Sequence, residues 1–201
     1  MLVLASASPR RRELLTQAGY TFEVRPADIP EDPYPNEDPI AYVTRLAREK
    51  AEAVFTEITK APASDTRASA APQVLGADTT VTLDSHILGK PSDPADAARM
   101  LRLLSGRTHR VITGVALVTA TSTEVAAEVT AVQFLTLSDQ EIEAYILTGE
   151  PMDKAGAYAI QGRAARWIPR IEGCYFNVVG LPISLVSTLL DSAQPAGLLT
   201  R

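Results

Sequence analysis

The sequence is poor in cysteine and histidine. It has one cysteine, Cys174, and two histidines among its 201 residues. A single cysteine cannot form an intramolecular disulfide, so nothing here indicates an oxidising compartment. The two histidines, His86 and His109, do not have the spacing of zinc ligands. These shortages exclude a disulfide-rich domain and a structural zinc site.

Long apolar runs and an excess of positive charge are also missing. No window approaches the roughly 18 consecutive apolar residues of a transmembrane helix. The apolar run at residues 1–7 is too short for the core of a signal peptide and is followed, not preceded, by basic residues. The net charge of −5 and the pI near 5.1 argue against nucleic-acid binding, which usually needs a basic face. We therefore expect a cytoplasmic protein with neither a membrane nor a nucleic-acid partner.

What the sequence does contain is an alternation of short apolar runs with amphipathic helical patterns. Apolar periodicity and capping signals predict helices at residues 9–18, 38–55, 94–104, 138–149 and from 182 onwards. Gly19 is predicted to end the first of them, and Ser138 and Glu141 match a capping box that opens the fourth. Strands are predicted at residues 2–5, 21–24, 74–77, 80–83, 110–119, 124–137 and in short runs around 167 and 178–179. This pattern predicts an α/β fold with a mixed sheet. Residues 60–73, rich in Ala, Ser, Pro and Thr, are predicted to form a flexible surface loop.

The first chemically informative stretch is S-A-S-P-R-R-R, at residues 6–12. Ser8 and Pro9 are typical of a helix start, where free N–H groups and the helix dipole bind anions. Three arginines at this end are unfavourable by several tenths of a kcal/mol each unless an anion offsets them. The setting between a strand and a helix favours an anion site. The alternative is a solvated basic cluster paired with the acidic loop at 28–38.

The second stretch, G-A-D-T-T-V at residues 76–81, places Asp78 within an apolar run. A buried carboxylate costs several kcal/mol unless it is paired with a cation or bound to a metal. Asp78 could instead hydrogen-bond within its own turn. The catalytic interpretation gains from Lys90, which follows in L-G-K-P and could return on a neighbouring strand.

Two further stretches are less decisive. Residues 150–162, E-P-M-D-K-A-G-A-Y-A-I-Q-G, hold acids, a lysine and an amide that could recognise a base or a phosphate. They could equally form a connection tied down by salt bridges. In G-C-Y-F-N-V-V-G-L-P, Gly180 is typical of a turn into the last helix, and Asn177 is either structural or a ligand contact.

Seven segments taken in order are more specific than any one of them. They are L-A-S-A-S-P-R-R-R-E-L-L, Y-V-T-R-L-A-R-E-K-A, G-A-D-T-T-V, G-K-P, A-A-R-M-L-R-L-L-S-G-R-T-H, G-E-P-M-D-K-A-G-A-Y-A-I-Q-G and V-V-G-L-P-I. Together they closely resemble the Maf family of nucleotide pyrophosphatases, from Leu2 to about Leu190. Residues 60–73 and the last ten or so residues do not take part in the resemblance.

The resemblance implies a single domain over residues 1–201, in which a long mixed sheet and helices form two lobes around a deep nucleotide-binding cleft. It also implies hydrolysis of a nucleoside triphosphate to the monophosphate and pyrophosphate with Mg²⁺ or Mn²⁺, by a homodimer. The D-K-A-G-A-Y-A-I-Q-G loop resembles the branch that acts on dTTP and UTP, with modified pyrimidine nucleotides as further candidates. The alternatives are a 7-methyl-GTP pyrophosphatase and a non-catalytic nucleotide-binding regulator of cell division.

Carried over from the family's motifs, three residues have catalytic roles. Asp78 would be the proton acceptor that activates water, or a metal ligand. Glu31 would join the metal and phosphate site, and Lys90 would neutralise charge that develops on phosphate. A protein that only bound nucleotides would not need this set, which favours the enzyme.

Other residues would bind the substrate. The family's motifs assign contacts with the triphosphate to Ser6, Arg10, Arg11 and Lys154. They assign a part in substrate choice to Arg10, Thr79 and Gln161. Arg12 has no role in this scheme.

Overall fold

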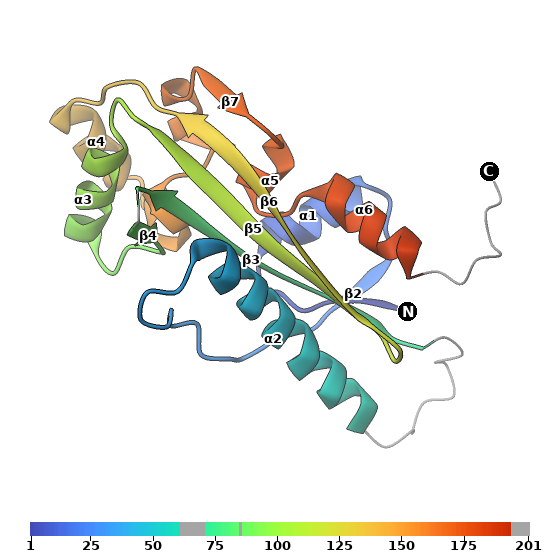
Figure 1. The fold of residues 1–201 in the computed structure, drawn as a ribbon. Helices are drawn as coiled ribbons and strands as arrows, with labels where there is room; N and C mark the ends of the chain where they lie inside the picture. The colour runs from blue at the N-terminus through green and yellow to red at the C-terminus, as the bar shows by residue number, and fades with distance from the viewer. Residues whose placement is uncertain (61–70, 85, 194–201) are drawn as a thin grey trace. The chain divides into compact units, whose positions relative to one another are not determined.

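A computed structural model describes residues 1–60, 71–84 and 86–193 of the chain (Figure 1). The strands are β1 (Leu2–Leu4), β2 (Phe22–Val24), β3 (Gln73–Leu83), β4 (His86–Leu88), β5 (Thr108–Val118), β6 (Thr123–Gln133) and β7 (Arg170–Glu172). The α-helices are α1 (Pro9–Gln17), α2 (Pro39–Lys60), α3 (Pro94–Leu104), α4 (Asp139–Ile146), α5 (Tyr175–Val179) and α6 (Ile183–Ser192). Short 3₁₀ helices are η1 (Glu150–Asp153), η2 (Ala155–Ala157) and η3 (Arg163–Trp167).

The described strands form one sheet in the order β2-β1-β3-β5-β6-β7, with β4 paired to β3. β1 runs parallel to both β2 and β3, whereas β4 is antiparallel to β3 and β7 is antiparallel to β6. The sheet is therefore mixed, and the predicted α/β class is confirmed. Figure 1 shows β3, β5 and β6 as the long strands of this sheet.

The chain divides into two compact units. Unit 1 takes residues 1–78, 114–127 and the segment from Gly180, and unit 2 takes residues 79–113 and 128–179. The division falls within β3, β5 and β6, so each long strand contributes residues to both units. On β3 it falls between Asp78, the predicted catalytic residue, and Thr79, which is predicted to take part in substrate choice.

In unit 1, helix α2 packs closely against the sheet. Its buried stripe, which includes Val43, Ala47 and Ala51, has the spacing of an amphipathic helix. A Cβ added to Gly76 would lie 2.1 Å from the carbonyl oxygen of Ala47, and one added to Gly114 would lie 2.3 Å from that of Val43. Only glycine permits this approach, so these two positions fix how closely α2 sits on β3 and β5.

In unit 2, the core is rich in aromatic rings. Phe134 makes edge contacts with His109 and Tyr158, at centroid separations of 5.0 and 4.8 Å. Tyr145 makes a similar contact with Trp167 at 5.0 Å. All five rings are buried, and such pairs stabilise a core by about 0.5–1.5 kcal/mol beyond their area burial.

The predicted helix boundaries are largely confirmed. The Ser8 side chain caps α1 by accepting a hydrogen bond from the Arg11 N–H, and Gly19 follows the helix at φ +83°. Ser138 and Glu141 form the predicted capping box of α4. Helix α2 is longer than expected, because residues 56–60 continue it to a terminal Lys60 that suits the helix dipole.

Three local predictions were wrong. β3 runs through Asp78 without interruption, because Lys50 compensates the charge that was expected to break the strand. Residues 178–179 belong to helix α5 and Trp167 to a 3₁₀ helix, although β-branched and aromatic side chains favour strands. Residues 150–162 contain the 3₁₀ helices η1 and η2.

Most of the predicted surface loop at residues 60–73 lies outside the described residues. Its ends belong to regular elements, with Lys60 closing α2 and Gln73 opening β3. The single two-lobed domain with a deep cleft stays a prediction.

Candidate functional site

The strongest polar feature of unit 1 is a lysine held between two carboxylates. Lys50 Nζ, from α2, lies 2.7 Å from Asp78 Oδ1 on β3 and 2.5 Å from Glu31 Oε1 in the segment before α2. Lys50 and Asp78 are only 7% and 8% exposed, whereas the Glu31 side chain is 51% exposed. Of the alternatives left open for Asp78, the structure shows a buried carboxylate that is paired with a cation.

Lys50 was not among the residues predicted from the sequence. It lies within Y-V-T-R-L-A-R-E-K-A and on the buried stripe of α2, one turn after Leu46 and before Val54. A lysine at an apolar position of a helical stripe is rarely fully buried unless paired. A lysine on the apolar stripe of α2 was therefore the signal in the sequence from which Lys50 could have been identified.

Ser6 and Arg11 lie beside this cluster in unit 1. Arg11 Nη1 donates to Ser6 Oγ at 3.1 Å and to the Ala77 carbonyl oxygen at 2.8 Å, while its Nε donates to the Gly180 carbonyl oxygen at 2.8 Å. Burial lowers the pKa of Arg11, with the charge of Asp78 acting in the opposite direction. Arg11 thus ties α1 to the strand residue that precedes Asp78.

Arg10 belongs to the same group. Its charge acts on Arg11 and helps to lower the pKa of that guanidinium. Arg10 is partly buried at the start of α1, whereas Arg12 is exposed. The structure therefore brings five predicted residues together in unit 1: Ser6, Arg10, Arg11, Glu31 and Asp78.

The remaining predicted residues lie in unit 2, where Thr79 begins a neutral network. Thr79 Oγ1 lies 2.9 Å from Thr113 Oγ1, which donates to the carbonyl oxygen of Asn177 at 3.2 Å. The Asn177 amide donates to the Val111 carbonyl oxygen and to Thr130 Oγ1 at 3.0 and 2.9 Å. Asn177 is fully buried, which decides for its structural interpretation.

A backbone hydrogen bond joins the segment that contains Lys90 to the segment that contains Lys154. The Gly156 N–H donates to the Gly89 carbonyl oxygen at 3.0 Å, which places the residue before Lys90 beside the residues that follow Lys154. Lys154 Nζ forms an ion pair with Asp153 and donates to the Glu150 carbonyl oxygen at 3.3 Å. Lys90 is exposed and lies just after the end of β4.

Gln161 is exposed on a turn that the Glu150 carboxylate holds. The carboxylate accepts hydrogen bonds from the Tyr145 hydroxyl at 2.7 Å and from the Arg163 N–H at 3.1 Å. A Cβ added to Gly162 would lie 1.9 Å from Glu150 Oε1. Polar contacts thus tie residues 150–162 down, while Gln161 stays exposed.

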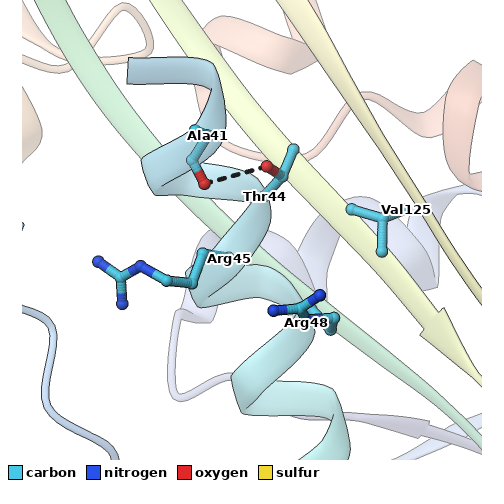
Figure 2. A pocket seen from close by; sticks show the side chains of 5 residues that line it. All are labelled: Ala41, Thr44, Arg45, Arg48 and Val125. Atoms are coloured by element: carbon cyan, nitrogen blue, oxygen red, sulfur yellow. Dashed lines mark hydrogen bonds between the residues drawn. The ribbon is translucent and has the colours of Figure 1, made fainter. Parts of the chain in front are cut away.

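A pocket of about 230 Å³ lies elsewhere on unit 1, between α2 and β6 (Figure 2). Its lining contains none of the predicted site residues: it consists of Ala41, Thr44, Arg45, Arg48 and Val125. Figure 2 shows the Arg45 side chain extending from α2 away from Val125. This pocket is not the candidate site.

Two negative findings hold for the residues that the structure describes. No three or more His, Cys, Asp and Glu side chains gather there in a group that could hold a metal. No helix in that part of the chain is long and apolar enough to cross a membrane.

Comparison with known proteins decides the family. A family model described as Maf-like protein matches residues 1–193. The chain belongs to the Maf family. This confirms the resemblance first seen in seven short segments, and the mixed sheet flanked by helices agrees with it.

Curated relatives of this Maf protein cover nearly its whole length. A protein of Koribacter versatilis, named dTTP/UTP pyrophosphatase, is 53% identical over 192 residues, which are 96% of this chain and 94% of the relative. A protein of Moorella thermoacetica with the same name is 53% identical over 94% of this chain and 93% of its own. A third, from Aromatoleum aromaticum, also bears the name and is 48% identical over 95% and 94% of the two chains.

Proposed function

We propose that this Maf protein is a nucleoside triphosphate pyrophosphatase that hydrolyses dTTP and UTP to the monophosphate and pyrophosphate. The observation that carries the proposal is the shared name of relatives about half identical to the chain over almost all of its length. The cluster of Asp78, Lys50 and Glu31 supports an enzyme rather than a protein that only binds nucleotides, because buried ionisable groups of this kind are concentrated at catalytic sites.

In the proposed reaction, a water oxygen attacks the α-phosphorus and the bond from that phosphorus to the bridging α–β oxygen breaks. Pyrophosphate is the leaving group, and Asp78 accepts the proton of the attacking water. Lys50 holds the Asp78 carboxylate in place at 2.7 Å. Phosphoryl transfer depends mainly on such positioning and on charge stabilisation.

The donor set fits a divalent cation. Asp78 and Glu31 supply carboxylate oxygens that share one ammonium, and Mg²⁺ is typically bound by one or two carboxylates plus substrate phosphates. When bound, Mg²⁺ or Mn²⁺ would offset the negative charge of the phosphate oxygens. Asp78 and Glu31 are the residues proposed to hold it.

The triphosphate needs several cationic and hydroxyl contacts. Ser6, Arg10, Arg11, Lys90 and Lys154 are the residues proposed to supply them. For the base, we propose Thr79 and Gln161, together with Arg10. A homodimer and a cytoplasmic location remain predictions.

Pyrophosphate release from a panel of triphosphates tests the function. With Mg²⁺ or Mn²⁺ present, we expect dTTP and UTP to give the highest kcat/KM among dTTP, UTP, CTP, GTP and 7-methyl-GTP. Turnover of 7-methyl-GTP alone would move the protein to that branch, and turnover of none would overturn the enzyme.

The variant Gln161→Glu tests the proposed base contact. Replacing the amide by a carboxylate removes its donor, so the ranking of dTTP and UTP above the other triphosphates should shrink. An unchanged ranking would remove Gln161 from the site.

A further inference from the structure

Glu31 lies in a segment that lacks regular structure, residues 25–38 between β2 and α2. Its side chain is 51% exposed, so contacts of the carboxylate alone hold it weakly. Its position beside Lys50 therefore depends on how firmly the backbone of this segment is attached to α2.

Arg45 makes the main attachment. Its Nε and Nη2 donate to Glu37 Oε1 and Oε2 at 2.7 and 2.8 Å, which is a bidentate pair. Its Nη1 lies 3.2 Å from Glu49 Oε2 on the next turn of α2. Glu37 lies near the end of the segment and Glu49 belongs to the helix, so one guanidinium joins the two.

Arg45 also reaches the residues next to Glu31. Nη2 donates to the Asp32 carbonyl oxygen at 3.2 Å, and the guanidinium carbon lies 4.0 Å from the centroid of the Tyr34 ring. One turn earlier on α2, the Tyr42 hydroxyl donates to the carbonyl oxygen of Glu31 itself at 2.8 Å. The backbone is thus held at Glu31 and at the residue that follows it.

The Arg45 side chain is buried for a charged residue, with 13% of its surface exposed. A planar fork with two carboxylates, a carbonyl and a ring around it loses little entropy for each bond that it forms. Lysine cannot reproduce this arrangement, since its ammonium is a point charge.

We propose that Arg45 is a positioning residue for Glu31: it fixes residues 31–37 on α2 and so places the Glu31 carboxylate on Lys50. Its effect on turnover rests on the proposed function, whereas its effect on the segment does not. Arg45 need not touch the substrate.

A double-mutant cycle on turnover tests the effect through Glu31, with Arg45→Ala, Glu31→Gln and the two combined. We expect Arg45→Ala to lower kcat for dTTP about tenfold and Glu31→Gln to lower it further. In the Glu31→Gln background, Arg45→Ala should cost less than twofold, because the group it positions is gone. Independent, multiplying losses would overturn the proposal.

Arg48→Ala is the matched control on the same helix. Its guanidinium is half exposed and lies 3.9 Å from Glu52, so its loss should leave kcat unchanged. If Arg45→Ala fails to fold, Arg45→Lys takes its place, because it keeps the charge while losing the fork.

Amide hydrogen exchange provides a readout that needs no substrate. Exchange at residues 31–37 should rise in Arg45→Ala and stay unchanged in Arg48→Ala. Unchanged exchange in both would overturn the positioning role even if turnover fell. A wild-type protein without turnover, together with raised exchange in Arg45→Ala, would refute the proposed function and leave the attachment of the segment standing.

Discussion

The two units hold their candidate residues by different kinds of interaction. In unit 1, charged groups meet directly, with Lys50 between Asp78 and Glu31. In unit 2, neutral groups dominate around Thr79, where Thr113 links it to the backbone of Asn177. The first arrangement is costly to bury and sensitive to the loss of one member, whereas the second consists of hydrogen bonds between neutral groups.

This difference suggests a division of work. A charged cluster can exchange an internal partner for a phosphate or a cation, which suits the residues proposed for chemistry. A neutral buried network has one stable arrangement, which suits residues that orient a base. The following predictions test this contrast, from the largest effect to the smallest.

The largest effect is expected from Asp78→Asn, which removes the proposed proton acceptor but keeps its shape. We expect kcat for dTTP to fall about 10³-fold, which corresponds to about 4 kcal/mol, while the circular dichroism spectrum stays unchanged. The matched change in unit 2 is Thr113→Val, which breaks the contact with Thr79 and should lower kcat/KM less than tenfold. Equal losses in the two variants would abolish the contrast between the units.

Removing the shared cation tests the cost of the charged cluster. Lys50→Met removes the ammonium that Asp78 and Glu31 share, and we expect a loss of about 3 kcal/mol in the free energy of unfolding, measured with urea. The double variant Lys50→Met with Asp78→Asn should regain part of that loss, because the buried negative charge is gone. A double variant less stable than Lys50→Met would contradict this explanation.

Much of the fold could be predicted because its signals are local. Ser8, Gly19 and the Ser138–Glu141 box act within one turn of their helices, and the structure reproduces all three. Asp78 was likewise identified by a local contradiction, a carboxylate within an apolar run. Such features depend on neighbours in the sequence, which a single chain reveals.

What could not be predicted depends on distant partners. Lys50 and Asp78 are 28 residues apart, so nothing local showed that one compensates the other or that β3 continues through Asp78. The helical state of residues 178–179 was missed for the same reason, since Thr130 on β6 binds both the N–H and the carbonyl oxygen of Cys174 just before α5. Long-range pairing overrode local propensity in each case.

We expect acid to lower the stability of the protein through His109, a buried residue of unit 2. Burial lowers its pKa to about 4, below the usual value of 6.5, and its Nε2 lies 2.8 Å from the Tyr158 hydroxyl. Between pH 6.5 and 4 the unfolded chain binds a proton that the folded chain does not, so the free energy of unfolding should fall as the pH falls, by about 2–3 kcal/mol in all.

Unfolding of the wild type and of His109→Gln, followed over that pH range, measures this contribution. The difference between the two should change with pH below 6.5 and stay constant above it. A constant difference between wild type and His109→Gln at every pH would show that the buried imidazole does not resist protonation.

The smallest effect concerns the turn that carries Gln161. In Gly162→Ala the new Cβ would lie 1.9 Å from Glu150 Oε1, so the carboxylate must move and loosen its bonds to Tyr145 and Arg163. We expect a loss of about 1–2 kcal/mol in the free energy of unfolding.

Glu150→Ala provides the control, because the three heavy atoms nearest to the new Cβ all belong to the Glu150 carboxylate. With that side chain shortened, adding Gly162→Ala should cost less than about 0.5 kcal/mol. A full loss in that background would mean that Gly162 is required by the backbone itself. The near-absence of a further loss would show that this part of unit 2 depends on the steric fit of one side chain, Glu150, in contrast to the ion pairs around Lys50.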